Sequence, residues 1–232
     1  MTLAHLAGQP TGMKLHHFSW GLYPRRVTLY LAEKAIRGVQ LLDIDPTNPR
    51  TMTRVHELSP LGTVPVLETE DGLVIRQSQA ILEYLEECFP EPNLMGETPA
   101  ARAATRELMA LIDEASTFFG IWCHKGSPVF AGLEPQSAEA AAMAAEGYGK
   151  RIRLLDTLMA DAPFLTGDKV TIADCMAMAL FQFAKGFYGV ALPADCTKLI
   201  GWYERFARRP SVSTPEYPPD LLRLSYGLKT TP

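Results

Sequence analysis

A proline interrupts the most strand-like stretch in the first half of the chain. Val64, Val66 and Leu67 are typical of a buried strand, yet Pro65 lies among them. Proline has no N–H to donate to a sheet ladder and is normally confined to strand edges and entrances. A cis Val64–Pro65 bond at the strand entrance resolves the conflict, because X–Pro bonds tolerate the cis form at a cost of about 0.5–1 kcal/mol. Val64 would then offer its own N–H and C=O to an extended, peptide-like ligand.

The residues after this strand predict a hairpin followed by a helix. Glu70-Asp71-Gly72 is a turn signal, and Leu73-Val74-Ile75 is a short apolar return strand. Gln77 and Ser78 then open a helical pattern. Because helix N-termini bind anions, this order of elements predicts a site for a small, anionic, peptide-like ligand.

The segments before the proline predict a small mixed sheet with helices packed on it. Strands are expected at Met13–Phe18 and Val39–Ile44, with a helix from Pro24 between them. Thr51–Leu58 is expected to form a short, irregular helix. With the hairpin and its helix, the order β-α-β-α-β-β-α describes an α+β fold.

The character of the sequence changes after residue 89, where strand patterns end and alanine-rich helical patterns begin. A proline-containing linker at 90–98 is expected to join a domain at 13–89 to an all-helical domain with a C-terminal tail at 99–232. Residues 1–12 are expected to form a flexible extension. The helices expected in the second domain are 99–122, 137–160, 171–187 and 196–208.

A local signal marks the start of one of these helices. Thr171 is followed three residues later by Asp174, which is the capping-box pattern with Asp in place of Glu. The threonine side chain can accept the N–H of the third helical residue while the carboxylate reaches back to the threonine N–H. We expect a structural role for Asp174, with the cap contributing about 1 kcal/mol.

Composition sets limits on the function. A formal net charge of −4 over 232 residues gives no reason to expect a nucleic acid or an anionic membrane as partner. No apolar run approaches the roughly 20 residues of a membrane span. The four cysteines are scattered without a CxxC pair, so neither a metal site nor a disulfide framework is indicated. A reducing, cytoplasmic location is expected.

Taken in order, these motifs resemble the glutathione transferase superfamily. The resemblance runs from Met13 to about Val212 and includes the proline strand, the Gln77-Ser78 pair and the break before a helical domain. It also includes Phe164 to Asp174 and the late Arg208-Arg209-Pro210-Ser211-Val212. The resemblance implies a thioredoxin-like N-terminal domain, an all-helical C-terminal domain and a homodimer.

The resemblance also implies how glutathione, a tripeptide with two carboxylates and a thiol, would be held. Val64, between Thr63 and Pro65, would pair with the backbone of the cysteinyl unit. Gln77 and Ser78 would bind the γ-glutamyl end, although Gln77 replaces the acidic residue of the family and brings no charge. Arg50 lies where many members place a basic residue for the glycyl carboxylate. Its alternative role is that of a solvated loop arginine.

The sequence leaves the catalytic group open. A hydroxyl near the start of the first helix would stabilise the glutathione thiolate, which is the nucleophile. Counting back from Arg25-Arg26-Val27, the position of the family's serine or cysteine falls on Gly21, which has no side chain. The candidates are therefore Ser19, then Tyr23, then a backbone N–H of this loop.

A second, apolar substrate is expected between the two domains. The aromatic residues that could line its pocket are Trp20, Phe118, Trp122 and Tyr188. The alternative is that Phe118 and Trp122, four residues apart, simply pack in a helical core. The tail from Ser211 is expected either to fold over the site or to be mobile.

Two functions remain in view. The first is a glutathione transferase that lowers the pKa of the thiol and directs the thiolate at an apolar electrophile. The second is a glutathione-binding carrier or interaction module of the same fold with little or no catalysis, which Gly21 and Gln77 favour. A thiol-disulfide reductase is disfavoured, because no cysteine occurs before Cys88.

Overall fold

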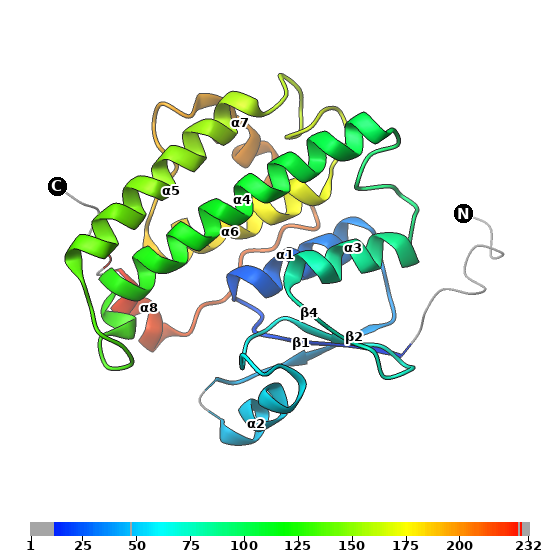
Figure 1. Ribbon diagram of the computed structural model, residues 1–232. Helices are drawn as coiled ribbons and strands as arrows, with labels where there is room; N and C mark the ends of the chain where they lie inside the picture. Colours follow the sequence, from blue (N-terminus) through cyan, green and yellow to red (C-terminus); the bar gives the residue numbers. More distant parts are fainter. Residues whose placement is uncertain (1–11, 47, 227, 229–232) are drawn as a thin grey trace. The chain divides into compact units, whose positions relative to one another are not determined.

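The computed structural model describes residues 12–46, 48–226 and 228, and these fall into two compact units (Figure 1). The first unit, here called the sheet unit, ends at Leu94, and the second, the helical unit, begins at Met95. The division lies inside the linker predicted at 90–98. Except for Gly12, the predicted N-terminal extension lies outside the described residues.

The sheet unit is a four-stranded mixed sheet with helices on both faces. Its strands have the order β2-β1-β3-β4, with β1 parallel to β2, and with β3 antiparallel to both β1 and β4. Helices α1 and α3 cover one face, and α2 covers the other (Figure 1). This is the predicted thioredoxin-like arrangement. Its elements are β1 Met13–His17, α1 Leu22–Glu33, β2 Val39–Asp43, α2 Pro49–Leu58, β3 Val66–Glu68, β4 Val74–Arg76 and α3 Ser78–Cys88.

The second helix of this unit is more regular than the sequence analysis predicted. The segment expected as an irregular helix at Thr51–Leu58 is a ten-residue helix that begins at Pro49. The Asn48 side chain accepts a hydrogen bond from the N–H of Arg50 at 3.0 Å and so caps the helix. Proline suits the first helical position, because its missing N–H would have had no partner there.

The named elements in the described part of the helical unit are all helices, as predicted. Its elements are α4 Pro99–Gly126, the 3₁₀ helix η2 Pro128–Phe130, α5 Ala138–Leu158, α6 Ile172–Tyr188, α7 Thr197–Phe206 and α8 Pro219–Ser225. Helix α4 extends four residues beyond its predicted end, to the point where Ser127 precedes Pro128. The residue before a proline is biased away from helical geometry, which accounts for the stop.

Helix α6 is the centre of the helical unit, and the predicted capping box begins it. All ten residues from Ile172 to Phe181 are buried, as expected for a helix that is apolar all round. Asp174 accepts hydrogen bonds from the N–H of Thr171 at 2.8 Å and of Leu165 at 2.9 Å, and from the Trp202 indole at 2.8 Å. Burial raises the pKa of Asp174, and these donors oppose the shift.

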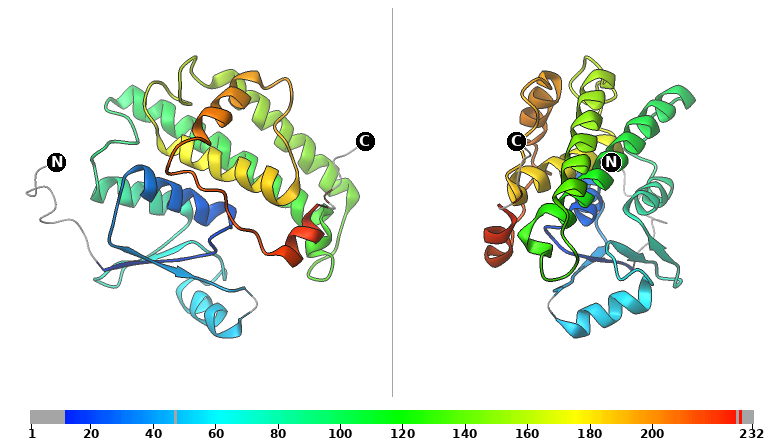
Figure 2. Two further views of the ribbon diagram at one scale, coloured as in Figure 1. Left: turned by 180° about the vertical axis from the view of Figure 1, so that it is seen from behind. Right: turned by 60° about the vertical axis from the view of Figure 1, so that its left-hand side comes forward.

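The tail after α7 packs along α6, as the view from behind shows (Figure 2). Gln182 Nε2 donates to the carbonyl of Ser213 at 3.0 Å, and the Tyr217 hydroxyl donates to the carbonyl of Gln182 at 2.9 Å. A Cβ at Gly186 would lie 2.8 Å from the Tyr217 ring, so the glycine makes room for it. Helix α8, which the sequence analysis did not predict, ends the described tail, and Ser225 bonds the carbonyl of Phe187.

Candidate functional site

The proline of the third strand has the geometry that the sequence suggested. The Val64–Pro65 peptide bond is cis, and β3 begins at the next residue, Val66. Val66 pairs with His16 on one side and Arg76 on the other, so the ladder starts after the proline. Within the described residues, the backbone N–H and C=O of Val64 have no hydrogen-bond partner. An extended ligand can therefore pair with them.

The turn from β4 into α3 brings Gln77 and Ser78 to the helix start. Gln77 has φ 72° and ψ 121°, a backbone conformation that non-glycine residues rarely adopt. Residues held in such regions cost about 1–3 kcal/mol and are concentrated at functional sites. Ser78 is the first residue of α3 and is only 4% exposed.

A buried arginine lies beside this helix start. Arg26, on α1, is 0% exposed, and its Nη1 donates to the Ser78 hydroxyl at 3.3 Å. Its guanidinium also lies 4.7 Å from the centre of the Tyr23 ring. The free N–H groups and dipole of a helix N-terminus already favour an anion, and Arg26 adds a full positive charge there.

The sequence analysis did not single out Arg26, although its position carried a signal. It precedes Tyr30 by four residues and Val27 by one, so it lies on the apolar face of its own helix. Charged residues are almost never fully buried unless they are paired. An arginine on the buried face of a helix therefore indicates a polar partner, which is Ser78 here.

The loop between β1 and α1 contains the candidate catalytic hydroxyls. Ser19 is exposed, and its backbone N–H donates to Asp43 Oδ1 at 3.0 Å. Among the described residues the Ser19 hydroxyl has no partner. Gly21 is the N-cap of α1 and so provides no side chain there. Tyr23 is the second residue of the helix and is 38% exposed.

Both helix starts in this region lack side-chain caps. In α1 and in α3, no N-cap side chain accepts a hydrogen bond from the first-turn N–H groups. These groups need partners from outside the helix. The helices α2, α4 and α5 differ, because in each the side chain of the N-cap residue accepts from the first turn: Asn48, Thr98 and Ser137.

Arg50 lies at the start of α2, apart from the Ser78 cluster in the sequence. It is exposed, and within the described residues its guanidinium has no partner. Thr63 is exposed, Val64 is half-buried and Pro65 is buried. Arg50 therefore has the freedom to bind a ligand carboxylate, but it also has the surroundings of a solvated surface arginine.

The aromatic residues predicted for the second substrate belong to different units. Trp20 is half-buried on the first loop of the sheet unit, where its ring stacks on Phe18 at 5.9 Å. Trp122 is buried in the helical unit, with its ring 5.9 Å from that of Phe119. Tyr188 is also buried against Phe119, at 5.6 Å.

Phe118 packs against other residues of α5 than Trp122, whose ring lies 6.1 Å from that of Tyr148. Its ring lies 4.5 Å from the Arg151 guanidinium on α5. A Cβ at Gly147 would lie only 2.5 Å from the Phe118 ring, so the two helices approach closely there. Phe118 and Trp122 thus contact different residues within the helical unit. Phe119, which was not predicted, packs with Trp122 and Tyr188.

The cysteines have the surroundings of structural residues. Cys123, Cys175 and Cys196 are buried, and Cys88 is partly so. Burial raises the pKa of Cys196 to about 11 and also raises that of Cys123, so neither is a thiolate at neutral pH. Among the described residues, no three His, Cys, Asp or Glu side chains are grouped to hold a metal ion. No described helix has the length and apolarity for crossing a membrane.

These features define a class of protein: a thioredoxin-like unit with an open backbone edge and two uncapped helix starts, followed by a helical unit. Comparison with known proteins agrees with that class. The chain matches the glutathione S-transferase N-terminal domain over residues 20–88 and the glutathione S-transferase C-terminal domain over residues 108–210. It belongs to the glutathione S-transferase family.

Individual relatives carry different names. Glutathione S-transferase 2 of Saccharomyces cerevisiae is 32% identical over 209 residues, which cover 83% of this chain and 84% of the relative. FtsZ-localized protein A of Caulobacter vibrioides is 31% identical over 210 residues, covering 84% and 87%. A solved glutathione S-transferase domain-containing protein of Marinobacter aquaeolei is 31% identical, with a TM-score of 0.76 and coverage of 86% of this chain and 100% of that one.

Proposed function

We propose that this protein is a glutathione transferase that holds glutathione along the start of β3 and the start of α3. The observation that carries the proposal is the cluster at the N-terminus of α3, where the buried Arg26 donates to the buried Ser78 hydroxyl at 3.3 Å. No N-cap side chain occupies the helix start. A carboxylate placed there would accept from the helix N–H groups and from Ser78, with Arg26 supplying charge.

The parts of glutathione have separate partners in this proposal. The γ-glutamyl carboxylate binds at Ser78, and the side-chain oxygen of Gln77 accepts from the α-amino group. The cysteinyl unit pairs with the N–H and C=O of Val64, with Thr63 and Pro65 on either side. The glycyl carboxylate binds Arg50, which can make two parallel hydrogen bonds to it.

The chemical step needs a hydrogen-bond donor to the sulfur. We assign it to the Ser19 hydroxyl first, to the Tyr23 hydroxyl second and to a backbone N–H of the same loop third. The bond from the Ser19 N–H to Asp43 holds this loop against the end of β2. The thiol proton leaves to solvent, the thiolate sulfur forms a bond to the electrophilic carbon, and a leaving group departs or a proton is added.

The remaining parts of the proposal follow from the family. The electrophile is small and apolar, and Trp20, Phe118, Trp122 and Tyr188 are the candidates for its pocket. The protein acts as a homodimer in the cytoplasm, with glutathione as co-substrate and without a metal.

A second candidate function is a glutathione-binding module without efficient catalysis. Two observations favour it: Gly21 leaves the start of α1 without a side-chain donor, and Gln77 brings no charge. A relative named for localisation with FtsZ is about as similar to this chain as the yeast transferase.

The experiment that separates the two functions is an ultraviolet titration of bound glutathione, following thiolate absorbance against pH. For a transferase, we expect the thiol of bound glutathione to titrate well below the ordinary thiol pKa of about 8.5. Ser19→Ala should raise that pKa, and Thr117→Ala, an exposed change on α4, should leave it unaltered. Saturable binding with an unshifted thiol would instead establish the binding module, and absence of binding would refute both functions.

A further inference from the structure

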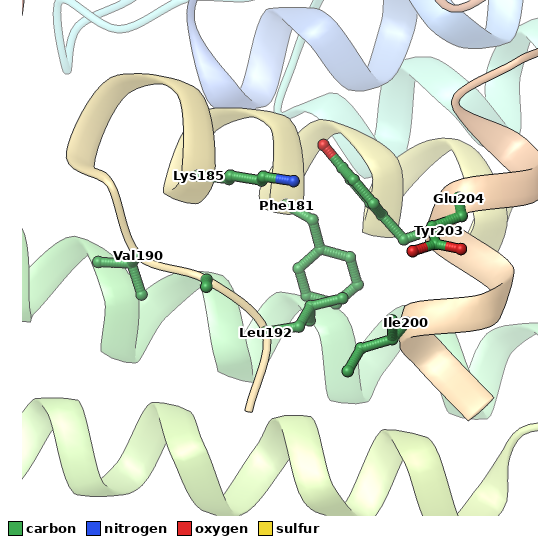
Figure 3. A pocket seen from close by; sticks show the side chains of 8 residues that line it. Phe181, Lys185, Val190, Leu192, Ile200, Tyr203 and Glu204 are labelled. Atoms are coloured by element: carbon green, nitrogen blue, oxygen red, sulfur yellow. The ribbon is translucent and has the colours of Figure 1, made fainter. Parts of the chain in front are cut away.

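The helical unit contains a cavity of about 220 Å³ that the glutathione site does not use. It lies between the second half of α6, the connection that follows Tyr188, and α7. Figure 3 shows Phe181, Leu192 and Ile200 gathered together, with Lys185 approaching from α6 and Tyr203 and Glu204 from α7. The cavity thus has an apolar part and a polar part.

The elements that line this cavity are fixed to their neighbours by hydrogen bonds. Trp202, on α7, is fixed to Asp174 at the start of α6 by a hydrogen bond of 2.8 Å. The N–H of Leu199 donates to Asp156 of α5 at 2.8 Å, which fixes the first turn of α7. The N–H of Val190 donates to the carbonyl of Ala184 at 2.8 Å and directs the connection away from α6. The cavity is therefore preformed.

The apolar part has room for one ring. Phe181 and Val190 are buried, and Leu192 and Ile200 are half-buried. An apolar cavity of about 150 Å³ is enough to bind benzene, so a 220 Å³ cavity holds a ring with a short substituent.

The polar part carries one charge of each sign. The Lys185 ammonium lies 5.2 Å from the centre of the Tyr203 ring. Lys185 and Glu204 are both exposed, and within the described residues neither has an ion-pair partner. A lysine in the last turn of α6 also suits the helix dipole, but that accounts for neither the cavity nor Glu204. Burial raises the pKa of the Tyr203 hydroxyl, so it is a neutral hydrogen-bond donor at pH 7.

This arrangement selects a class of ligand by its charges. A ligand with only a carboxylate would be attracted by Lys185 and repelled by Glu204. A ligand with only an amine would be attracted by Glu204 and repelled by Lys185. A ligand with both groups and an apolar side chain satisfies all three parts of the cavity. From the cavity and the two opposite charges beside it, we infer that the helical unit has a binding site for a free aromatic amino acid.

In this site the ring lies against Phe181 and Ile200, the α-carboxylate faces Lys185 and the Tyr203 hydroxyl, and the α-ammonium faces Glu204. Small ligands of this size gain a modest binding free energy per heavy atom. We therefore expect a Kd of about 1 mM or tighter for L-phenylalanine. The site is separate from the glutathione site, and its test uses no glutathione.

The test is calorimetric titration of the full chain with L-phenylalanine, 3-phenylpropanoate, which lacks the amine, and phenethylamine, which lacks the carboxylate. Phenylalanine should bind most tightly, by about fivefold over each analogue, which is the scale of a partly exposed charge pair. No saturable binding of phenylalanine up to about 10 mM, or equal binding of all three, would overturn the inference.

Two charge variants test whether Lys185 and Glu204 select the ligand, and neither alters the core. Glu204→Gln should remove the preference for phenylalanine over 3-phenylpropanoate, and Lys185→Met should remove the preference over phenethylamine. Glu216→Gln and Lys150→Met are matched controls, because both side chains are exposed and lie outside the cavity. If the two preferences survive their variants, the charges do not select the ligand and the inference fails.

A third variant tests the location. Ile200→Trp should fill the apolar part of the cavity and abolish binding, and a urea unfolding curve will show whether the chain still folds. Ile121→Trp, at a 43% exposed position on α4, is the control for adding an indole ring. Unchanged phenylalanine binding in a folded Ile200→Trp variant would place the ligand elsewhere and refute the assignment.

Discussion

The start of α3 and the start of α1 lie in the same unit, and both lack a side-chain cap. They differ in the polar side chains that surround them. At α3, Ser78 is buried and bonded to the buried Arg26, and Gln77 is held in a rare backbone conformation. At α1, Gly21 provides no side chain, and Ser19 is exposed without a partner for its hydroxyl among the described residues.

The difference separates binding from chemistry. A buried, charged and strained helix start destabilises the fold unless it is compensated, so its presence favours a role in holding an anionic ligand. The start of α1, beside the predicted position of the thiol, has no comparable cluster of buried polar side chains. We therefore expect substitutions at α3 to change glutathione affinity, and substitutions at α1 to change the ionisation of the bound thiol.

The largest effect is expected for Ser78→Ala. Loss of a hydrogen bond to a charged group costs about 1.5–3 kcal/mol, so glutathione affinity should fall about 10- to 100-fold. The measurement is a calorimetric Kd, together with a urea unfolding curve to confirm that the variant is folded. Thr117→Ala serves as the control, and a change of less than twofold at Ser78 would remove the basis for the assignment.

Arg26→Lys should have the next largest effect. Lysine keeps the positive charge but loses the planar fork of donors that can reach both the serine and a carboxylate. We expect glutathione affinity to fall about tenfold, with a smaller loss for Arg102→Lys, a half-buried arginine of the helical unit. Equal small losses in both variants would show that Arg26 contributes only to packing.

Gln77→Gly should change stability and binding in opposite directions. Glycine tolerates a positive φ, so the substitution relieves the strain of the folded state. Glycine also gives the unfolded chain more freedom, which offsets part of this gain. The net result should be a rise of about 1 kcal/mol in the free energy of unfolding. Loss of the amide should weaken glutathione binding several-fold. Gln77→Ala is the matched control, because it loses the amide and keeps the strain. Equal stability of the two variants would contradict the strain.

The smallest effect is expected for Ser19→Ala. Loss of one hydrogen bond of about 1 kcal/mol to the thiolate should raise the pKa of bound glutathione by somewhat less than one unit and reduce turnover about fivefold. The Kd of glutathione should remain nearly unchanged. Tyr23→Phe is the competing variant, with Tyr226→Phe, 64% exposed, as its control. A shift in Tyr23→Phe alone would reverse the ranking of the two hydroxyls.

The contrast between the two helix starts also explains what the sequence could predict. The strand with Pro65, the hairpin and the Gln77-Ser78 helix start are specified by neighbouring residues, and all are present in the structure. The donor at α1 depends on how a short loop leaves β1, and spacing alone does not place a hydroxyl in space. The sequence does place Arg26 on an apolar helix face, and that position indicates a buried polar partner.

The errors in the helices have similar causes. The sequence does not predict the regular start of α2 at Pro49, because Asn48 and the proline after it are also typical of a loop. Helix α8 was missed because its segment begins with consecutive prolines, which end helices but also suit a first helical turn. Its position is set by contacts with α6 that are distant in the sequence.

The attachment of the tail to α6 bears on the order in which the chain acquires its structure during synthesis. Domains generally fold as units, with the N-terminal one first. Every described element of the sheet unit precedes residue 94, so this unit can fold while the rest is being translated. The carbonyls of Gln182 and Phe187 each accept a hydrogen bond from the tail, from the hydroxyls of Tyr217 and Ser225. These two contacts of the central helix of the second unit therefore form only after Tyr217 and Ser225 have been made.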